Sequence, residues 1–173
     1  PKLIEVDFNN LSKIGLNSFK HITISDERGS LKISHESDNN IQFKGFSMKE
    51  SFSYKGAARG LHIQDPSISP QTKIIEVLEG TIYDFVFNIN APDSIYYFKL
   101  DANFKASVLV PQNFAHGFIA MTDVRFRYFC LGGYDEGNEK TYNSLNSAGD
   151  LLNISNLELS DKDALYPELN CKK

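Results

Sequence analysis

The chain of 173 residues is 41% hydrophobic, carries a formal net charge of −4, and has no run of basic residues. This length predicts one domain with one core, spanning residues 1–173. The scattered charge argues against nucleic acid or an anionic membrane surface as the main partner. No apolar run approaches the roughly 20 residues of a membrane span, and the N-terminus lacks the hydrophobic region of a signal peptide. Since Cys130 and Cys171 form no CxxC pair, we expect reduced thiols in a cytoplasmic protein.

Strand signals dominate the chain. The segment that contains His62 is predicted to be a strand, and turn-forming residues separate further short apolar or alternating runs. These runs are Lys73–Leu78, Thr81–Ile89, Ile95–Leu100, Ser107–Val110, Gly117–Met121 and Val124–Leu131. The Glu79-Gly80 pair and the segment Asn90–Asp93 are predicted turns. Many short strands joined by tight turns predict an all-β antiparallel sandwich or barrel.

Helical signals are sparse. The best candidate is a short C-terminal helix at Ser160–Leu165, where Ser160 is a suitable N-cap. The polar segment Asn138–Asn156 is predicted to be a long loop.

Strand alternation predicts which polar side chains interrupt apolar faces. Successive side chains point to opposite faces, so His62 and Gln64 share one face. Lys73, Asp84 and Tyr128 each share a face with apolar neighbours on their own strands. Burying such groups unpaired would cost ~1–3 kcal/mol each. A polar pocket inside the barrel is therefore expected.

Arg59 has the wrong parity to join His62 on a regular strand. It can reach the same pocket only if the strand starts or bulges near Gly60. Arginine binds anions through its forked donors, histidine removes protons near neutral pH, and Lys73 would stabilise the resulting negative charge. The pattern indicates acid/base chemistry on an anionic small molecule.

Several motifs in order along the chain resemble the dTDP-4-dehydrorhamnose 3,5-epimerase family. They are Arg59-Gly60-Leu61-His62-x-Gln64, Lys73, Gly80-x-x-x-Asp84, Pro111-x-x-Phe114-Ala115-His116-Gly117-Phe118 and Phe126-x-Tyr128, within a match that runs from about Asp26 to Asp163. The resemblance implies a cupin-type jelly-roll β-barrel, a homodimer, and no metal or organic cofactor. It implies a nucleotide-diphospho-4-keto sugar as substrate and a role in making surface polysaccharide sugars, as for capsule or lipopolysaccharide.

The resemblance also implies residue roles. His62 would be the general base with Asp163 as its hydrogen-bonded partner, and Lys73 would stabilise the enolate oxygen. Tyr128 would be the general acid on the opposite face of the sugar, provided that a nearby cation lowers its pKa from about 10. Substrate contacts are expected from Arg59 on the diphosphate, from Arg28 of the partner subunit, and from Ser53, Gln64, His116 and Tyr134.

Each of these residues also has a purely structural explanation. Tyr128 can be a core aromatic, Lys73 a solvated strand residue and His116 a part of the barrel wall. Asp163 follows Ser160 by three residues and can simply cap the helix. Asp84 is expected to be structural and to pair with a basic residue in the pocket.

The chain departs from the family pattern at positions where the family binds the nucleotide. Ile33 replaces a usual Glu, Ser47-Met48-Lys49 replaces Gln-Asp-Asn, Phe129 replaces a frequent Lys, and there is no Trp. A GDP-linked 4-keto sugar, including a heptose, therefore stays open beside the dTDP-linked one. Inversion at C3, at C5 or at both also stays open.

Three alternatives are kept. A metal-dependent cupin enzyme would need a His-x-His pair and a Glu, whereas this chain has His62-x-Gln64. A non-catalytic sugar-binding module would bind the nucleotide sugar without exchanging its protons. A 4-keto-sugar ketoisomerase would move the carbonyl instead of inverting a centre.

Overall fold

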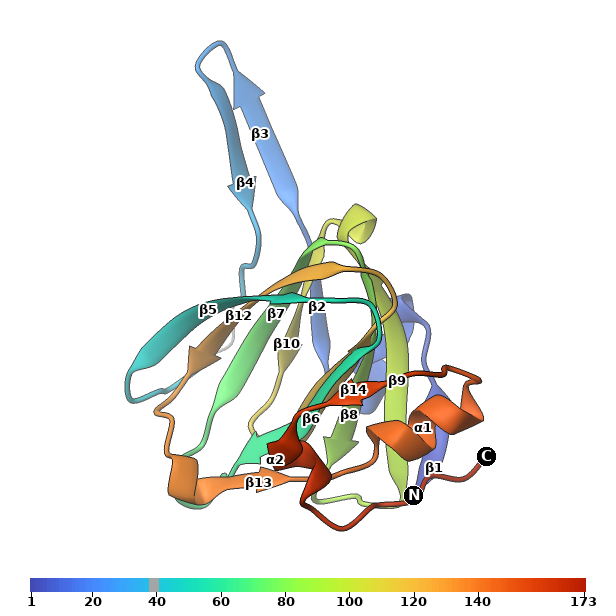
Figure 1. Cartoon of the computed structure of the whole chain (residues 1–173). Coiled ribbons are helices and arrows are strands. Elements are labelled where there is room, and N and C mark those ends of the chain that lie inside the picture. The colour runs from blue at the N-terminus through green and yellow to red at the C-terminus, as the bar shows by residue number, and fades with distance from the viewer. Residues whose placement is uncertain (38–40) are drawn as a thin grey trace.

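The computed structural model describes residues 1–37 and 41–173. Two sheets face each other as a cupin-type jelly-roll β-barrel, and a two-stranded hairpin protrudes from it (Figure 1). Among the described residues, no helix has the length and apolar character needed to cross a membrane.

The larger sheet has seven strands in the order β1-β9-β8-β11-β6-β13, with β14 also paired to β6. Its strands are β1 (Lys2–Glu5), β6 (Ala57–Gln64), β8 (Thr81–Asn88), β9 (Ser94–Asp101), β11 (Phe114–Ala120), β13 (Glu139–Thr141) and β14 (Glu158–Leu159). The smaller sheet has the order β2-β10-β7-β12-β5. Its strands are β2 (Asn17–Lys20), β5 (Phe46–Ser53), β7 (Thr72–Glu79), β10 (Ala106–Val110) and β12 (Val124–Leu131).

The protruding hairpin consists of β3 (Ile22–Asp26) and β4 (Gly29–Ile33). The helical segments are short. They are η1 (Phe8–Ile14), η2 (Ala102–Phe104), η3 (Glu136–Asn138), α1 (Leu145–Leu151) and α2 (Asp161–Ala164). Segment η1 adds Phe8 and Leu11 to the core between the sheets.

All the strands expected from apolar runs are present, with ends that shift by a few residues. The largest shift is at β11, which begins at Phe114 and not at Gly117. The predicted helix is also present as α2, and the Ser160 hydroxyl accepts a hydrogen bond from the Asp163 N–H. These expectations are confirmed.

The expected loop over Asn138–Asn156 is wrong, because it contains both β13 and α1. Strand β13 forms because it adds a ladder to β6. Helix α1 buries Leu145 and Ala148 against the outer face of the larger sheet, at the i, i+3 spacing of an amphipathic helix. Tertiary pairing and packing thus decide a segment that looks polar in sequence.

Alternation on β8 shows how the core is divided. Ile82 and Val86 pack between the two sheets, whereas Phe85 and Phe87 pack on the other side, beneath α1 and the C-terminal segment. The larger sheet is therefore covered on both faces, and its inner face is shared between an apolar core and a polar cavity.

Candidate active site

A cavity of about 440 Å³ opens between the two sheets. Polar residues predicted to lie on inward-facing strand positions line this cavity from both sheets. Arg59, His62 and His116 come from β6 and β11 of the larger sheet, and Lys73 and Tyr128 come from β7 and β12 of the smaller one. The expected polar pocket inside the barrel is therefore confirmed.

A β-bulge between β6 and β11 brings Arg59 to the same cavity as His62. The register pairs His116 with His62 but Phe118 with Arg59, so β6 carries one extra residue between the two pairs. Gly60 has a φ of +100° there, and a Cβ on it would lie 2.7 Å from the His116 carbonyl oxygen. Only glycine fits this conformation and this close approach. The bulge expected near Gly60 is confirmed.

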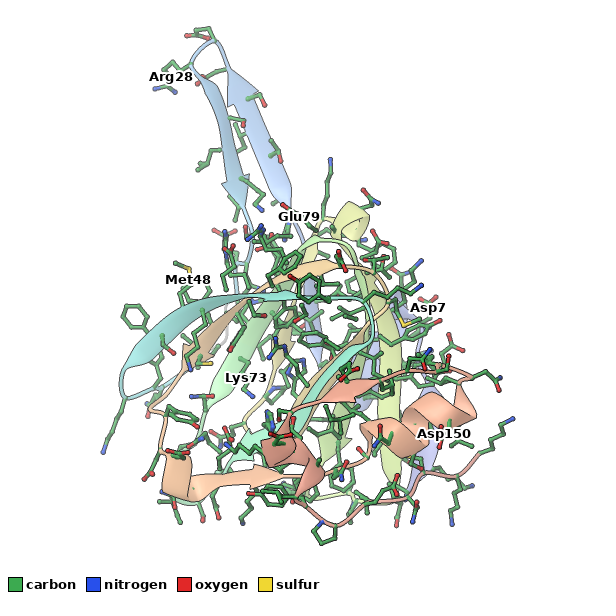
Figure 2. All side chains as sticks on the ribbon, viewed as in Figure 1. Asp7, Arg28, Met48, Lys73, Glu79 and Asp150 are labelled. Atoms are coloured by element: carbon green, nitrogen blue, oxygen red, sulfur yellow. The ribbon has the colours of Figure 1, made fainter. Side chains whose placement is uncertain are left out.

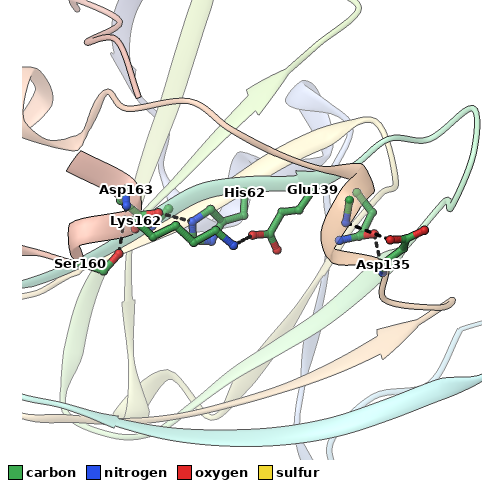
Figure 3. Close-up of polar contacts among 9 residues, drawn as sticks. His62, Asp135, Glu139, Ser160, Lys162 and Asp163 are labelled. Carbon is green, nitrogen blue, oxygen red and sulfur yellow. Dashed lines mark hydrogen bonds and ion pairs between the residues drawn. The ribbon is translucent and has the colours of Figure 1, made fainter. Parts of the chain in front are cut away.

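His62 is paired with Asp163 from α2 (Figure 3). The His62 Nε2 atom lies 2.6 Å from Asp163 Oδ1, and the Gly60 N–H donates to Oδ2 at 3.3 Å. The Asp163 N–H is itself capped by Ser160, so this residue serves the helix through its backbone and the histidine through its carboxylate. Burial acts to raise the pKa of Asp163, but the hydrogen bonds from His62 and Gly60 outweigh it and the pKa is lowered. An ionised carboxylate thus lies behind the imidazole.

Lys73 and Tyr128 face this pair from the opposite sheet. Burial lowers the pKa of the Lys73 ammonium, with Cys130 and Glu139 opposing the shift. Burial raises the pKa of Tyr128, and Arg59 opposes this without reversing it. The expectation of a cation-lowered tyrosine pKa is therefore wrong for the free protein, because burial of the phenol outweighs the charge of Arg59. Tyr128 is held protonated, as a proton donor must be.

A second histidine–aspartate pair lies beside the first. His116 Nε2 is 2.7 Å from Asp84 Oδ2, and both side chains are buried. The His116 ring stacks on Phe126 at 6.2 Å between centroids. Burial raises the pKa of Asp84, although His116 opposes the shift. The expected pairing of Asp84 with a basic residue of the pocket is confirmed.

Ser53 and Gln64 are not among the side chains that line the cavity. The Ser53 hydroxyl is buried and accepts from Arg59 Nε at 2.9 Å. The Gln64 carbonyl oxygen accepts from the Asp135 N–H at 3.0 Å and from the Ser69 hydroxyl at 3.1 Å. Ser53 therefore orients Arg59, and Gln64 ties down two loops. The direct substrate contacts expected of both residues stay predictions, and Gln64 Nε2 is buried without a hydrogen-bond partner among the described residues.

Arg28 and Tyr134 lie at different distances from the cavity. Tyr134 is half-exposed and lines the cavity rim. Arg28 lies at the far end of the hairpin, whereas Lys73 lies in the barrel (Figure 2). The Arg28 side chain is 85% exposed and bonds to Asp26 on the same hairpin. Within one chain Arg28 does not reach the cavity.

Sequence reasoning assigned no role to three charged residues that line the cavity, Lys49, Glu139 and Glu158. The Lys49 ammonium lies 5.0 Å from the centroid of the Tyr134 ring and 6.0 Å from that of Tyr128, within the range of a cation–π contact. Glu139 lines the cavity and pairs with Lys162 at 2.5 Å. The position of Lys162 next to Asp163 could have indicated a place near the site. Glu139 could not be placed, because its segment was predicted to be a loop.

Metal-ligating side chains do not cluster in the part of the chain that the structure describes. Within residues 1–37 and 41–173, no group of three or more His, Cys, Asp or Glu side chains is arranged to hold a metal ion.

Comparison with known proteins identifies the family. The sequence model of the family described as dTDP-4-dehydrorhamnose 3,5-epimerase matches residues 14–170. The chain belongs to this family. A dTDP-4-dehydrorhamnose 3,5-epimerase of Methanothermobacter thermautotrophicus is 30% identical over 90 residues, which is 50% of this chain and 48% of that protein. The Escherichia coli dTDP-4-dehydrorhamnose 3,5-epimerase is 31% identical over 121 residues, covering 65% of this chain and 64% of that protein.

Solved structures from the dTDP-4-dehydrorhamnose 3,5-epimerase family share the fold. The Elizabethkingia anophelis enzyme has a TM-score of 0.71 at 25% identity, covering 89% of this chain and 91% of that one. A Legionella pneumophila epimerase in complex with dTDP-4-keto-L-rhamnose has a TM-score of 0.67 at 26% identity, covering 86% and 85%. The matches to the curated relatives span between 48% and 64% of those proteins' own length.

Proposed function

We propose that this protein is an epimerase that inverts C3, C5 or both of a nucleotide-diphospho-4-keto-6-deoxy sugar, for the synthesis of surface polysaccharide sugars. A dTDP-linked hexose is the first candidate, because the family is described by it. One observation carries the proposal. A histidine backed by an ionised carboxylate and a protonated tyrosine enter one cavity from opposite sheets.

Proton removal falls to His62. The 4-keto group makes the protons on C3 and C5 acidic, because their loss gives an enolate. With Nε2–H donated to Asp163, Nδ1 is the nitrogen left to accept the proton. The Asp163 carboxylate fixes this tautomer and stabilises the imidazolium that forms.

Lys73 and Tyr128 complete the inversion from the other sheet. The Lys73 ammonium is a fixed positive charge for the enolate oxygen, a contribution typically worth several kcal/mol. Tyr128 then gives its hydroxyl proton to the carbon from the face opposite His62. The imidazolium returns its proton to solvent and the tyrosinate regains one, so the enzyme ends as it began. Arg59, oriented by Ser53, would bind the diphosphate through two donors.

Proton NMR in heavy water tests this function most directly. The purified protein would be mixed with a panel of dTDP- and GDP-linked 4-keto sugars, including a heptose. We expect deuterium to enter C3, C5 or both of one member, followed by an inverted product. Binding without exchange would indicate a sugar-binding module instead. A product with the carbonyl at a new carbon would indicate a ketoisomerase.

We also propose a homodimer in which the hairpin of one subunit covers the cavity of the other. The hairpin exposes apolar side chains at Ile22, Ile24 and Leu31, with exposed fractions of 46%, 56% and 61%. Strand β5 is an edge of its sheet and exposes Phe46 and Met48. Exposed apolar edges of this kind favour pairing with another chain. Such a dimer would carry Arg28 of the partner subunit to the cavity mouth.

Mixing two inactive variants tests the shared site. Arg28→Ala and His62→Asn homodimers should each lose activity. A mixed dimer has one site with its own His62 and with Arg28 of the partner subunit, so activity should return on mixing. Light scattering gives the oligomeric state of the wild type. An active monomer, or no recovery on mixing despite subunit exchange, would contradict this arrangement.

A further inference from the structure

An ion pair closes a ring of contacts around His62. Lys162 Nζ lies 2.5 Å from Glu139 Oε1, and the next residue after Lys162 is Asp163, which holds His62 (Figure 3). Glu139 stands on β13, and β13 pairs with β6 so that Thr141 opposes His62. The ring therefore runs from the strand that carries the base, through α2, to the neighbouring strand and back.

Helix α2 needs such an anchor. It has four residues, Asp161–Ala164, far fewer than the ~12–15 that an isolated helix needs for marginal stability. Its other attachments include the hydrogen bonds of Asp163 with His62 and Gly60, the Ser160 cap, and the short β14 pairing that precedes it. Immediately after it, Leu165 is 84% exposed and contributes little packing. The position of the Asp163 carboxylate depends on a few contacts, of which the Lys162–Glu139 pair is one.

The same pair sets the charge of one cavity wall. The Glu139 side chain is only 13% exposed and lines the cavity, whereas Lys162 is 46% exposed. A bare carboxylate there would repel a diphosphate. The negative charge of Glu139 also acts to raise the pKa of Lys73 and of Tyr128. Lys162 thus neutralises a group that would otherwise oppose substrate binding.

We propose that Lys162 and Glu139 are positioning residues that hold Asp163 on His62 and cancel a carboxylate that faces the anionic substrate. The catalytic part of this inference rests on the proposed function. The positioning part concerns the protein without substrate and can be tested separately.

The experiment compares Lys162→Met, Glu139→Gln and the double variant with a matched control, Lys140→Met. Lys140 is the next residue on β13 and forms an ion pair with Asp65 at 2.8 Å, and neither residue lines the cavity. The control therefore removes a lysine charge from a similar ion pair that also involves β13. The lysine of each pair is about half exposed, at 46% for Lys162 and 56% for Lys140. Because such partly exposed pairs contribute only about 0–1 kcal/mol, all four variants should fold with similar melting temperatures.

A proton NMR signal reports the positioning in the absence of substrate. The His62 Nε2 proton bonded to Asp163 should give a resolved downfield signal in the wild type and in Lys140→Met. In Lys162→Met the signal should broaden or vanish through exchange with water. A signal unchanged in Lys162→Met would overturn the positioning role whether or not the protein proves to be an epimerase.

Kinetics separate the two roles of the pair. Lys162→Met should lower kcat by about 10- to 100-fold through misplacement of Asp163 and raise KM on the order of ten-fold through the uncompensated Glu139 charge. The double variant should recover KM but not kcat, because it removes the charge without restoring the anchor. Equal values for Lys162→Met and the double variant would overturn the charge role.

The pH dependence of kcat/KM gives an independent test of the charge role of Glu139. The titratable groups on which Glu139 acts include Lys162 on α2, Tyr134, Lys73 on β7 and Tyr128 on β12. Glu136 of η3 acts on Lys162 and Tyr134 as well. Removing the negative charge in Glu139→Gln should lower the pKa of Lys73 and Tyr128. The alkaline limb of kcat/KM should therefore move to lower pH in Glu139→Gln and stay in place in Lys140→Met. An alkaline limb that does not move, or moves upward, would contradict the proposal.

Discussion

Two histidine–aspartate pairs of nearly equal length have their histidines on neighbouring strands, and they differ in almost every other respect. His62 and His116 are direct register partners across β6 and β11. Their nitrogens lie 2.6 and 2.7 Å from Asp163 and Asp84. Yet the His62 side chain is 29% exposed, whereas His116 is 7% exposed and Asp84 fully buried. The first pair can meet a substrate, and the second forms the wall beside it.

Hydrogen-bond donors explain why the two carboxylates behave differently. Asp163 receives donors at both oxygens, from His62 and from the Gly60 N–H, and its pKa is lowered. Asp84 Oδ1 is buried without a hydrogen-bond partner among the described residues, and burial raises its pKa. The comparison teaches that the surroundings of a His–Asp pair, more than its length, decide whether it can sustain charge during a reaction.

The largest expected effect separates the two histidines. His62→Asn should abolish deuterium exchange at C3 and C5, because a general base contributes about 10²–10⁴-fold in rate. His116→Asn should leave exchange measurable and instead reduce thermal stability, because it leaves Asp84 buried without its donor. NMR in heavy water and thermal unfolding measure both quantities. Deuterium exchange at the wild-type rate in His62→Asn would show that His62 is not the general base.

Removing the hydroxyl of Tyr128 shows what the His62–Asp163 pair does alone. In Tyr128→Phe, His62 can still take and return a proton on its own side, so exchange at the first carbon attacked should partly survive. Net inversion should fall by about 10²-fold or more, because no donor remains on the opposite face. One NMR time course gives both exchange and product configuration. Inversion near the wild-type rate would make Tyr128 a core residue and transfer the acid role to Tyr134 or water.

The smallest effect concerns stability against pH, where the two aspartates should show opposite signs. The pKa of Asp163 is lowered by folding, so its charge stabilises the protein above the unfolded value of about 3.9 and less as the pH falls. The pKa of Asp84 is raised, so its contribution is present at low pH and is lost as the pH rises. The stability difference between wild type and Asp163→Asn should grow with pH, and the stability difference between wild type and Asp84→Asn should shrink.

Urea unfolding between pH 3.5 and 7 measures these differences directly. Parallel pH slopes for the two variants would mean that the carboxylates share one environment, contrary to the structure.

Much of the cavity could be predicted from local pattern. Alternation placed Lys73, Asp84 and Tyr128 on inward faces, and all three point between the sheets with Ile75, Ile82 or Phe126. The parity conflict of Arg59 required a bulge, and the bulge is present. These features follow from the two-residue period of a strand, so a single sequence is enough to find them.

Other features depend on contacts that no local pattern records. Strand β13 and helix α1 form because β6 and the outer sheet face offer them partners. Gln64 and Ser53 have the residue types of ligand contacts, but the Gln64 side-chain oxygen accepts from neighbouring loops and the Ser53 hydroxyl accepts from Arg59. The direction of the Tyr128 pKa shift required knowing how deeply the phenol is buried. Each of these outcomes is set by segments distant in sequence.

The extra residue in β6 leaves one peptide N–H free to bond outside the sheet. Without this residue, Arg59 and His62 would be separated by one residue and would still point the same way, because side chains repeat every two positions. A β6 strand one residue shorter, without a bulge, would therefore aim both side chains equally well. What the extra residue adds is a peptide N–H outside the ladder, and the Gly60 N–H is bonded to Asp163. An interruption in the sheet thus supplies a hydrogen-bond donor that an uninterrupted strand would have used on its neighbour.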